Sequence, residues 1–141
     1  MKPNTILTRT EEIPRKHWLK YLDEFSKRHD GWLVDVEELM GERGAQREAT
    51  ALPFRGATAV LEPPSVTIEL GGDPSDHVEH RIEAPEHIWI ESLAGGAEAA
   101  LEIESAGGRK TLMAFRSPQP PEAVDGMPAP RGRRFSPRKR R

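Results

Sequence analysis

The chain has 141 residues, 31% of them charged, and a formal net charge of −2 at pH 7. It contains no cysteine, which excludes disulfides, thiol catalysis, iron–sulfur clusters and cysteine-ligated zinc. No apolar run approaches the roughly 18 residues that a membrane-spanning helix needs. Residues 1–12 show no signal-peptide pattern. We therefore expect a cytoplasmic protein with no membrane span.

The small net charge averages two unlike segments. Residues 1–115 carry 13 Lys and Arg against 21 Asp and Glu, whereas residues 116–141 carry 8 against 2. The second segment also holds six of the 13 prolines and only two of the 28 Leu, Ile, Val and Phe residues. So few apolar side chains cannot offset the entropy lost on ordering. We expect an acidic domain at 1–115 and a basic, Pro/Arg-rich, disordered tail at 116–141.

The first predicted element is a helix over residues 14–29. Pro14 suits the first helical position, because its missing N–H needs no partner there. Trp18, Leu22 and Phe25 then recur at helical spacing and form one apolar face.

Alternating apolar and polar residues predict strands for the rest of the acidic domain. These lie at 32–39, 45–52, 66–70, 78–84, around 88–90, around 101–103, and 111–115, and residues 57–62 are a further short candidate. Pro53 limits the second strand, and Gly107-Gly108 predicts a tight hairpin before the last one. Connections this short exclude parallel crossovers. The predicted fold class is α+β: one N-terminal helix packed on a mostly antiparallel meander sheet of six to seven strands, which can curl onto itself.

Several features follow one another along the acidic domain. They are Ile13-Pro14, Trp18 and Phe25 on the helix, Gly31-Trp32, a polar strand with Gln46, Leu52-Pro53, residues 66–71, His80, Pro85, and a hairpin ending with residues 111–115. This order resembles a family of small bacterial proteins catalogued as a domain of unknown function, over about residues 10–115. The resemblance implies a small stand-alone cytoplasmic protein and supplies no activity, cofactor or catalytic residue.

Histidines and carboxylates are the first candidates for a site. His77 and His80 lie three apart, so on a strand they point to opposite faces, and no third ligand is close in sequence. We expect no metal site, no cofactor and no catalytic constellation. His80 shares the apolar face of its strand, as a half-buried residue or as a pocket residue. Asp35 and Glu37 share one face of another strand. They form either a solvated acidic face or, if buried in a cleft, an acid–base pair.

Trp89 is the best candidate for an exposed functional aromatic residue. It lies between His87 and Glu91 and on the opposite face from Ile88 and Ile90. Together His80, Trp89, Asp35 and Glu37 are the predicted lining of a pocket against the sheet. The negative charge of the domain argues against Trp89 as a platform that stacks nucleic-acid bases.

The basic end of the tail is the most distinctive feature of the sequence. Its cations are Arg131, Arg133, Arg134, Arg138, Lys139, Arg140 and Arg141. Such a cluster binds nucleic acid, acidic protein or anionic lipid without sequence specificity. Alternatively, the tail folds back loosely on the acidic domain, because the two segments attract each other.

Three hypotheses for function remain open. The first is a small non-enzymatic interaction protein whose tail contacts an acidic protein or a polyanion such as nucleic acid. The second is a small-molecule-binding protein or enzyme with a site near His80, Trp89 and the acidic strand at 35–38. The third is a structural homo-oligomer. The sequence leaves enzymatic activity undecided, leaning against it, and it does not decide between monomer and homo-oligomer.

Overall fold

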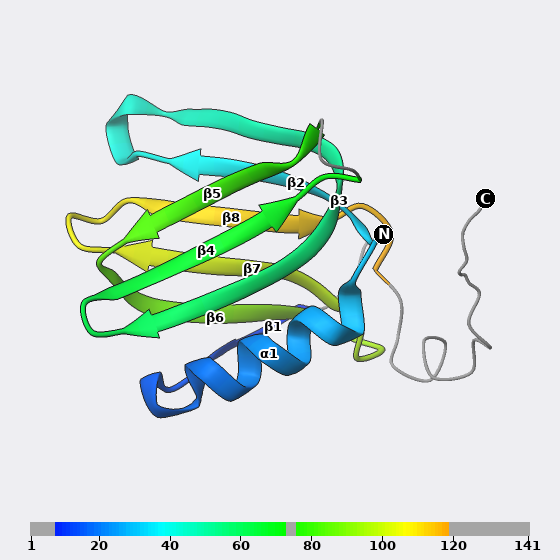
Figure 1. The fold of residues 1–141 in the computed structure, drawn as a ribbon, viewed down its shortest axis with the longest axis horizontal. Coiled ribbons are helices and arrows are strands. Elements are labelled where there is room, and N and C mark those ends of the chain that lie inside the picture. Colours follow the sequence, from blue (N-terminus) through cyan, green and yellow to red (C-terminus); the bar gives the residue numbers. More distant parts are fainter. Residues whose placement is uncertain (1–7, 73–75, 119–141) are drawn as a thin grey trace.

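A computed structural model of the chain describes residues 8–72 and 76–118. Its elements in chain order are β1 (Thr8–Glu12), the 3-10 helix η1 (Arg15–His17), α1 (Trp18–His29), β2 (Leu33–Leu39), η2 (Gly41–Arg43), β3 (Ala45–Leu61), β4 (Pro64–Leu70), β5 (Val78–Glu83), β6 (Pro85–Leu93), β7 (Glu98–Ser105) and β8 (Lys110–Phe115). The strands form one sheet in the order β1-β6-β7-β8-β2-β3-β4-β5, and each neighbouring pair is antiparallel (Figure 1).

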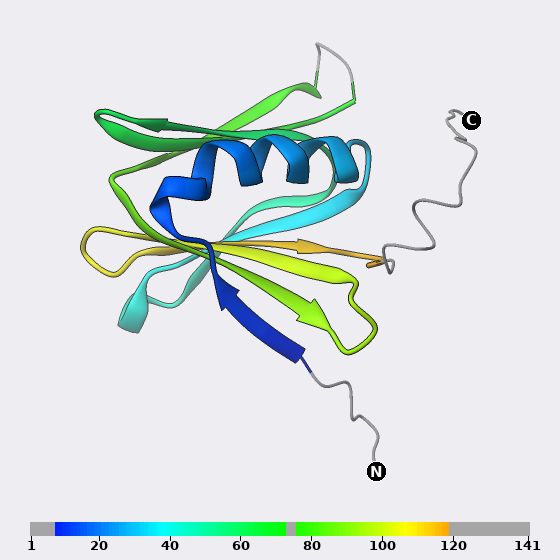
Figure 2. The same ribbon diagram turned by 90° about the horizontal axis from the view of Figure 1, so that it is seen from below.

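The sheet consists of two meanders. One is β2-β3-β4-β5 and the other is β6-β7-β8, and they are joined by pairing between β2 and β8. Ala84 alone separates β5 from β6, although these strands lie near opposite edges of the sheet. The sheet must therefore roll so that its two halves face each other. Figure 2 shows α1 between these halves.

Helix α1 lies between the two halves of the rolled sheet and buries one of its faces against them. Trp18, Leu22 and Phe25 are at most 1% exposed, and they pack in one core cluster with the apolar faces of the strands. Burying each such side chain stabilises the fold by about 1.5–3 kcal/mol. The Trp18 indole N–H also donates to the Ile13 carbonyl at 3.0 Å, which fixes the entry of the helix.

The predicted helix and the antiparallel α+β class are confirmed. Pro14 does not occupy the first helical position as predicted, because its backbone is extended and it caps η1, whereas α1 ends at the predicted residue, His29. The Gly107-Gly108 hairpin is also confirmed. Both glycines have positive φ values, 88° and 85°, a conformation that residues with a Cβ atom rarely adopt.

The strand count is slightly higher than predicted, because the described residues contain eight strands. One addition is β1, whose five residues are all exposed and therefore carry no apolar alternation. In the other direction, β3 is one strand of 17 residues where two strands were expected. Pro53 does not end it, because β3 passes there from pairing with β2 to pairing with β4. A missing N–H disturbs few ladder hydrogen bonds at such a position.

Candidate functional site

A pocket of about 440 Å³ opens inside the rolled sheet, between β5 and the β7–β8 hairpin. None of its lining residues belongs to α1. Its floor is the contact between the two halves of the sheet, where the Ala106 N–H donates to the Ala84 carbonyl at 3.0 Å. Pockets for small molecules usually enclose about 300–1,000 Å³. The pocket is therefore large enough for a small ligand.

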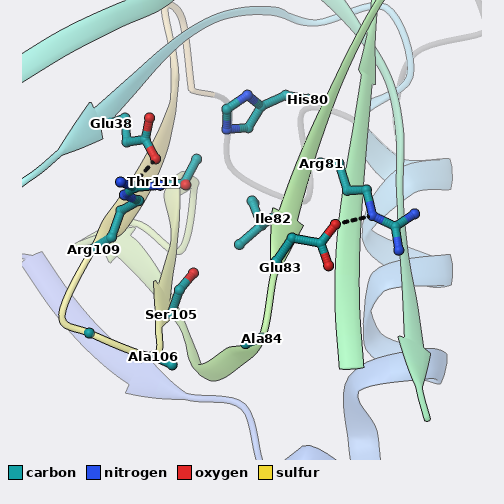
Figure 3. A pocket seen from close by; sticks show the side chains of 11 residues that line it. Glu38, His80, Arg81, Ile82, Glu83, Ala84, Ser105, Ala106, Arg109 and Thr111 are labelled. Atoms are coloured by element: carbon teal, nitrogen blue, oxygen red, sulfur yellow. Dashed lines mark hydrogen bonds and ion pairs between the residues drawn. The ribbon is translucent and has the colours of Figure 1, made fainter. Parts of the chain in front are cut away.

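Polar side chains reach this interior from strand positions that normally carry apolar residues. Strand pairing places Glu38, Thr111 and Ile103 in one row across β2, β8 and β7. On the facing wall, His80 pairs with the fully buried Ile68. Directly paired residues lie on the same face of a sheet. Glu38, Thr111 and His80 consequently face the pocket together with Ile82, as Figure 3 shows.

Charge in the pocket is partly balanced. The Arg109 guanidinium lies 3.2 Å from a Glu38 carboxylate oxygen, and the Glu38 side chain is 17% exposed against 56% for Arg109. On the facing wall, Arg81 and Glu83 form an ion pair with each other. Figure 3 shows this pair on the other side of β5 from His80 and Ile82. Glu38 is thus the carboxylate that faces the pocket interior.

Ser105 carries the clearest sign of an incomplete site. Among the residues that the structure describes, its Oγ is the buried side-chain polar atom without a hydrogen-bond partner. The residue is 5% exposed and lines the pocket at the end of β7. An unsatisfied buried hydroxyl costs about 1–3 kcal/mol. No hydrogen bond to His80 is found either within residues 8–72 and 76–118.

The four residues predicted from the sequence to line a pocket lie on two faces of the sheet. His80 lines the pocket. Trp89 and Glu37 lie on the opposite face, in a cross-strand row that also contains Glu102 and Leu112. We call this surface, formed by β1, β6, β7, β8 and β2, the outer face. Asp35 belongs to it too, two residues from Glu37 on β2.

Asp35 has partners that explain its position. Its carboxylate accepts the Ala51 N–H at 2.8 Å, where Ala51 has a positive φ of 53° within β3. It also accepts the Arg116 Nε–H at 3.1 Å, and Arg47 lies 3.7 Å away. Partial burial acts to raise the pKa of Asp35. The hydrogen bonds from Ala51 and Arg116 and the two arginine charges outweigh burial and hold that pKa below its usual value.

Trp89 is half-buried and stacks on His87, with ring centroids 5.2 Å apart. His87 Nδ1 in turn lies 2.7 Å from a carboxylate oxygen of Glu12 on the neighbouring strand β1. The hydrogen bond to Glu12 raises the pKa of His87 above its usual value. These contacts attach β1 to β6 on the outer face.

A second half-buried carboxylate, that of Glu98, holds α1 to the sheet. Glu98 of β7 accepts hydrogen bonds from the Tyr21 hydroxyl at 3.0 Å and from the Arg28 guanidinium, and it lies 3.2 Å from His29 Nε2. Burial acts to raise the pKa of Glu98, but the contacts with His29, Arg28 and Tyr21 lower it overall. Burial, together with Glu98, raises the pKa of Tyr21. This cluster is fully paired and leaves no room for a ligand role.

The sequence interpretation missed Ser105, Thr111 and Arg109. A signal for two of them was present. Ser105 continues the apolar alternation of Leu101 and Ile103, and Thr111 begins the alternation that Met113 and Phe115 continue. Polar residues in an apolar stripe predict interior hydrogen-bonding groups. Arg109 carries no such signal, because its role depends on the pairing of β2 with β8.

Within residues 8–72 and 76–118 there is no group of three or more His, Cys, Asp or Glu side chains that could hold a metal ion. No helix in the same part of the chain is long and apolar enough to cross a membrane. The tail cations, from Arg131 to Arg141, lie outside the described residues. A tail contact with nucleic acid or acidic protein stays a prediction, as do the cytoplasmic location and the oligomeric state.

The chain matches a protein family of unknown function, DUF5335, over residues 9–124. No curated protein and no solved structure matches it. The match covers the whole rolled sheet and its helix, and it extends slightly beyond the stretch over which the resemblance was expected. The chain therefore belongs to the family of unknown function DUF5335.

Proposed function

We propose that the protein binds a small polar molecule in the pocket between β5 and the β7–β8 hairpin. The observation that carries this proposal is the buried Ser105 hydroxyl, which has no hydrogen-bond partner in a pocket of ligand size. Native interiors pair nearly all of their buried polar groups. A ligand hydroxyl, amide or carboxylate that reaches Ser105 supplies the missing partner.

The surrounding side chains define the class of ligand. Glu38 and Arg109 cancel each other's charge, so a strongly charged ligand would have to separate them. Thr111 and His80 add further hydrogen-bonding groups, and Ile82 adds an apolar surface. A neutral or zwitterionic molecule with hydroxyl or amide groups on one side fits this mixture, since small-molecule sites combine apolar walls with a few converging polar groups.

The proposal can be tested with the full chain, isotopically labelled for NMR. The probes are serine, glycerol and glucose, each added at millimolar concentrations. We expect at least one of them to shift the amide signals of Ser105, Thr111 and His80 before any others. Shifts confined to other parts of the sheet, or no shifts with any probe, would contradict the proposal.

Variants give the same test a second readout. Ser105→Ala should weaken binding of the probe by roughly tenfold, the effect of losing one hydrogen bond worth about 1.4 kcal/mol. The matched control is Ser92→Ala, because Ser92 is a half-buried serine on β6 that does not line the pocket. Equal weakening by both variants would show that the probe does not bind at Ser105.

A further inference from the structure

The outer face of the sheet is independent of the pocket and has no covering element among the described residues. The helix packs on the opposite face, where the core lies. Trp89, Leu112 and Ala114 are half-buried and form the middle of the outer face. Glu102 of β7 lies between Trp89 and Leu112 in their cross-strand row, and Glu91 on β6 and Glu104 on β7 lie on the same face. Apolar and acidic side chains thus lie side by side on this face, which suits a partner segment that carries both cations and an aromatic residue.

Arginine side chains already occupy one end of this face. Arg116, the first residue after β8, places its guanidinium on both carboxylate oxygens of Asp35, at 3.1 and 3.3 Å. Arg47 of β3 lies 3.1 Å from Glu37. The chain thus leaves the sheet with its first C-terminal cation seated on the outer face, and the carboxylates at that end bind guanidinium groups.

The other end of the face has no such partner. Within residues 8–72 and 76–118, no ion pair or hydrogen bond involves the side chains of Glu91 and Glu104. Glu102 faces Lys110 at 3.6 Å, and no arginine. The outer face therefore carries carboxylates over both β2 and β6–β7, but among the described residues arginines pair only with those over β2.

The chain itself supplies the complementary charge. The structure describes the chain as far as Pro118, and seven Lys and Arg residues follow within residues 131–141, with Phe135 among them. An extended segment of about 12 residues spans up to roughly 40 Å. The distance across the sheet from β8 to β6 is only about 10 Å, two strand spacings. Residues 131–141 can therefore reach any part of the outer face.

We propose that residues 131–141 of this chain bind its own outer face over β6 and β7, with arginines on Glu91, Glu102 and Glu104 and with Phe135 against Trp89. Each exposed ion pair contributes less than about 1 kcal/mol. The tether compensates for this weakness, because a short linker gives an effective concentration in the millimolar range. An external polyanion must then displace residues 131–141 from the outer face before it can bind them.

The absence of cysteine allows a sharp test on the full chain. Ser136→Cys introduces a single thiol for a nitroxide spin label, and the indole N–H signals of the three tryptophans report its position. We expect the label to broaden the Trp89 signal selectively. Trp18 and Trp32 serve as internal references, because both pack against the core on the other side of the sheet.

Charge variants of the labelled chain identify the docking residues. The triple change Glu91→Gln, Glu102→Gln and Glu104→Gln should restore the Trp89 signal to the intensity seen with a reduced, diamagnetic label. The matched control removes the same charge from the β3–β5 half through Glu62→Gln, Glu69→Gln and Glu79→Gln, and it should leave the broadening in place. Raising the salt concentration from 0.1 M to 1 M shortens the Debye length from about 10 Å to about 3 Å and should also restore the signal.

Two results would overturn the proposal. Equal broadening of all three indole signals, or broadening of none, would show that the basic segment has no seat on the outer face. A mixture of spin-labelled unenriched protein with unlabelled ¹⁵N-enriched protein should show no broadening of Trp89. Broadening in that mixture as strong as within one chain would mean that the segment docks on a second copy.

Discussion

The polar groups at the two ends of the rolled sheet's interior differ in whether the chain supplies their hydrogen-bond partners. Near α1, the Glu98 carboxylate meets Tyr21, Arg28 and His29, and every partner is satisfied by the chain itself. Near the β7–β8 hairpin, the buried Ser105 hydroxyl has no partner within the described part of the chain. Satisfied buried networks stabilise a fold, whereas unsatisfied groups are tolerated where something else binds. The difference distinguishes the Glu98 cluster, which stabilises the fold, from the pocket around Ser105, which is the candidate binding site.

Removing Glu98 tests the architectural end and should have the largest effect. Glu98→Ala removes the carboxylate that the Tyr21 hydroxyl donates to and that lies beside Nε2 of the buried His29. We expect the free energy of unfolding to fall by about 2–4 kcal/mol. Urea denaturation at pH 7, followed by tryptophan fluorescence, measures this. The control is Glu102→Ala, whose exposed pair with Lys110 is worth less than about 1 kcal/mol. Equal losses of unfolding free energy in both variants would show that the Glu98 cluster does not stabilise the fold more than a surface ion pair.

Acid should weaken both the Glu98 cluster and the contacts of Asp35 on the outer face. The pKa values of Glu98 and Asp35 lie below their usual range in the folded protein. A carboxyl with a lowered folded-state pKa stabilises the fold above its unfolded-state pKa, near 4, and this contribution disappears as pH falls through the folded-state value. The melting temperature should therefore drop steadily below about pH 4. Glu98→Gln should flatten that dependence, and an unchanged profile in this variant would contradict the assignment.

A pair of serine variants should move stability in opposite directions. Ser105→Ala removes a buried hydroxyl without a partner and should raise the free energy of unfolding by about 1 kcal/mol. Ser26→Ala should lower it by a similar amount, because the Ser26 hydroxyl donates to the Leu22 carbonyl and accepts the Ala57 N–H. Thermal unfolding of both variants provides the measurement. A loss of stability in Ser105→Ala would mean that its hydroxyl is paired in solution.

Glu38→Gln should have the smallest effect on stability. Its partner Arg109 is more than half exposed, so the pair behaves as a surface ion pair worth less than about 1 kcal/mol. Binding of a polar probe in the pocket should nevertheless weaken, because the carboxylate faces the interior. The control is Glu48→Gln on β3, outside the pocket. A large loss of stability would place Glu38 with Glu98 among the architectural residues.

Local patterns in the sequence predict the parts of the fold that depend on neighbouring residues. The α1 stripe of Trp18, Leu22 and Phe25 predicts a helix, and Gly107-Gly108 predicts a hairpin, because each follows from spacing or backbone freedom within a few residues. The strand β1 was missed for the converse reason. Its residues are all exposed, and it is held to β6 by backbone pairing that no local pattern encodes.

The site was predictable only in part. His80 lines the pocket, and its place between apolar residues made it a candidate. Asp35 and Glu37 were candidates because they share one face of an acidic strand, but strand alternation places that face opposite the one that carries Glu38. Which strand faces β5 across the interior depends on the order of the whole sheet. That order arises from pairing between β2 and β8, which are about 70 residues apart in sequence.

The one-residue link at Ala84 makes the two ends of the pocket different. The two sheet halves are tied together at Ala84 and Ala106, and the walls rise from there toward His80 on one side and Glu38 on the other. The contact between Ala84 and Ala106 therefore closes the end of the pocket beside Ser105. Under the proposed function, a ligand longer than the pocket would place one end beside Ser105 and leave the rest of its chain outside. The proposed ligand could for this reason be the terminal group of a larger chain as well as a free small molecule.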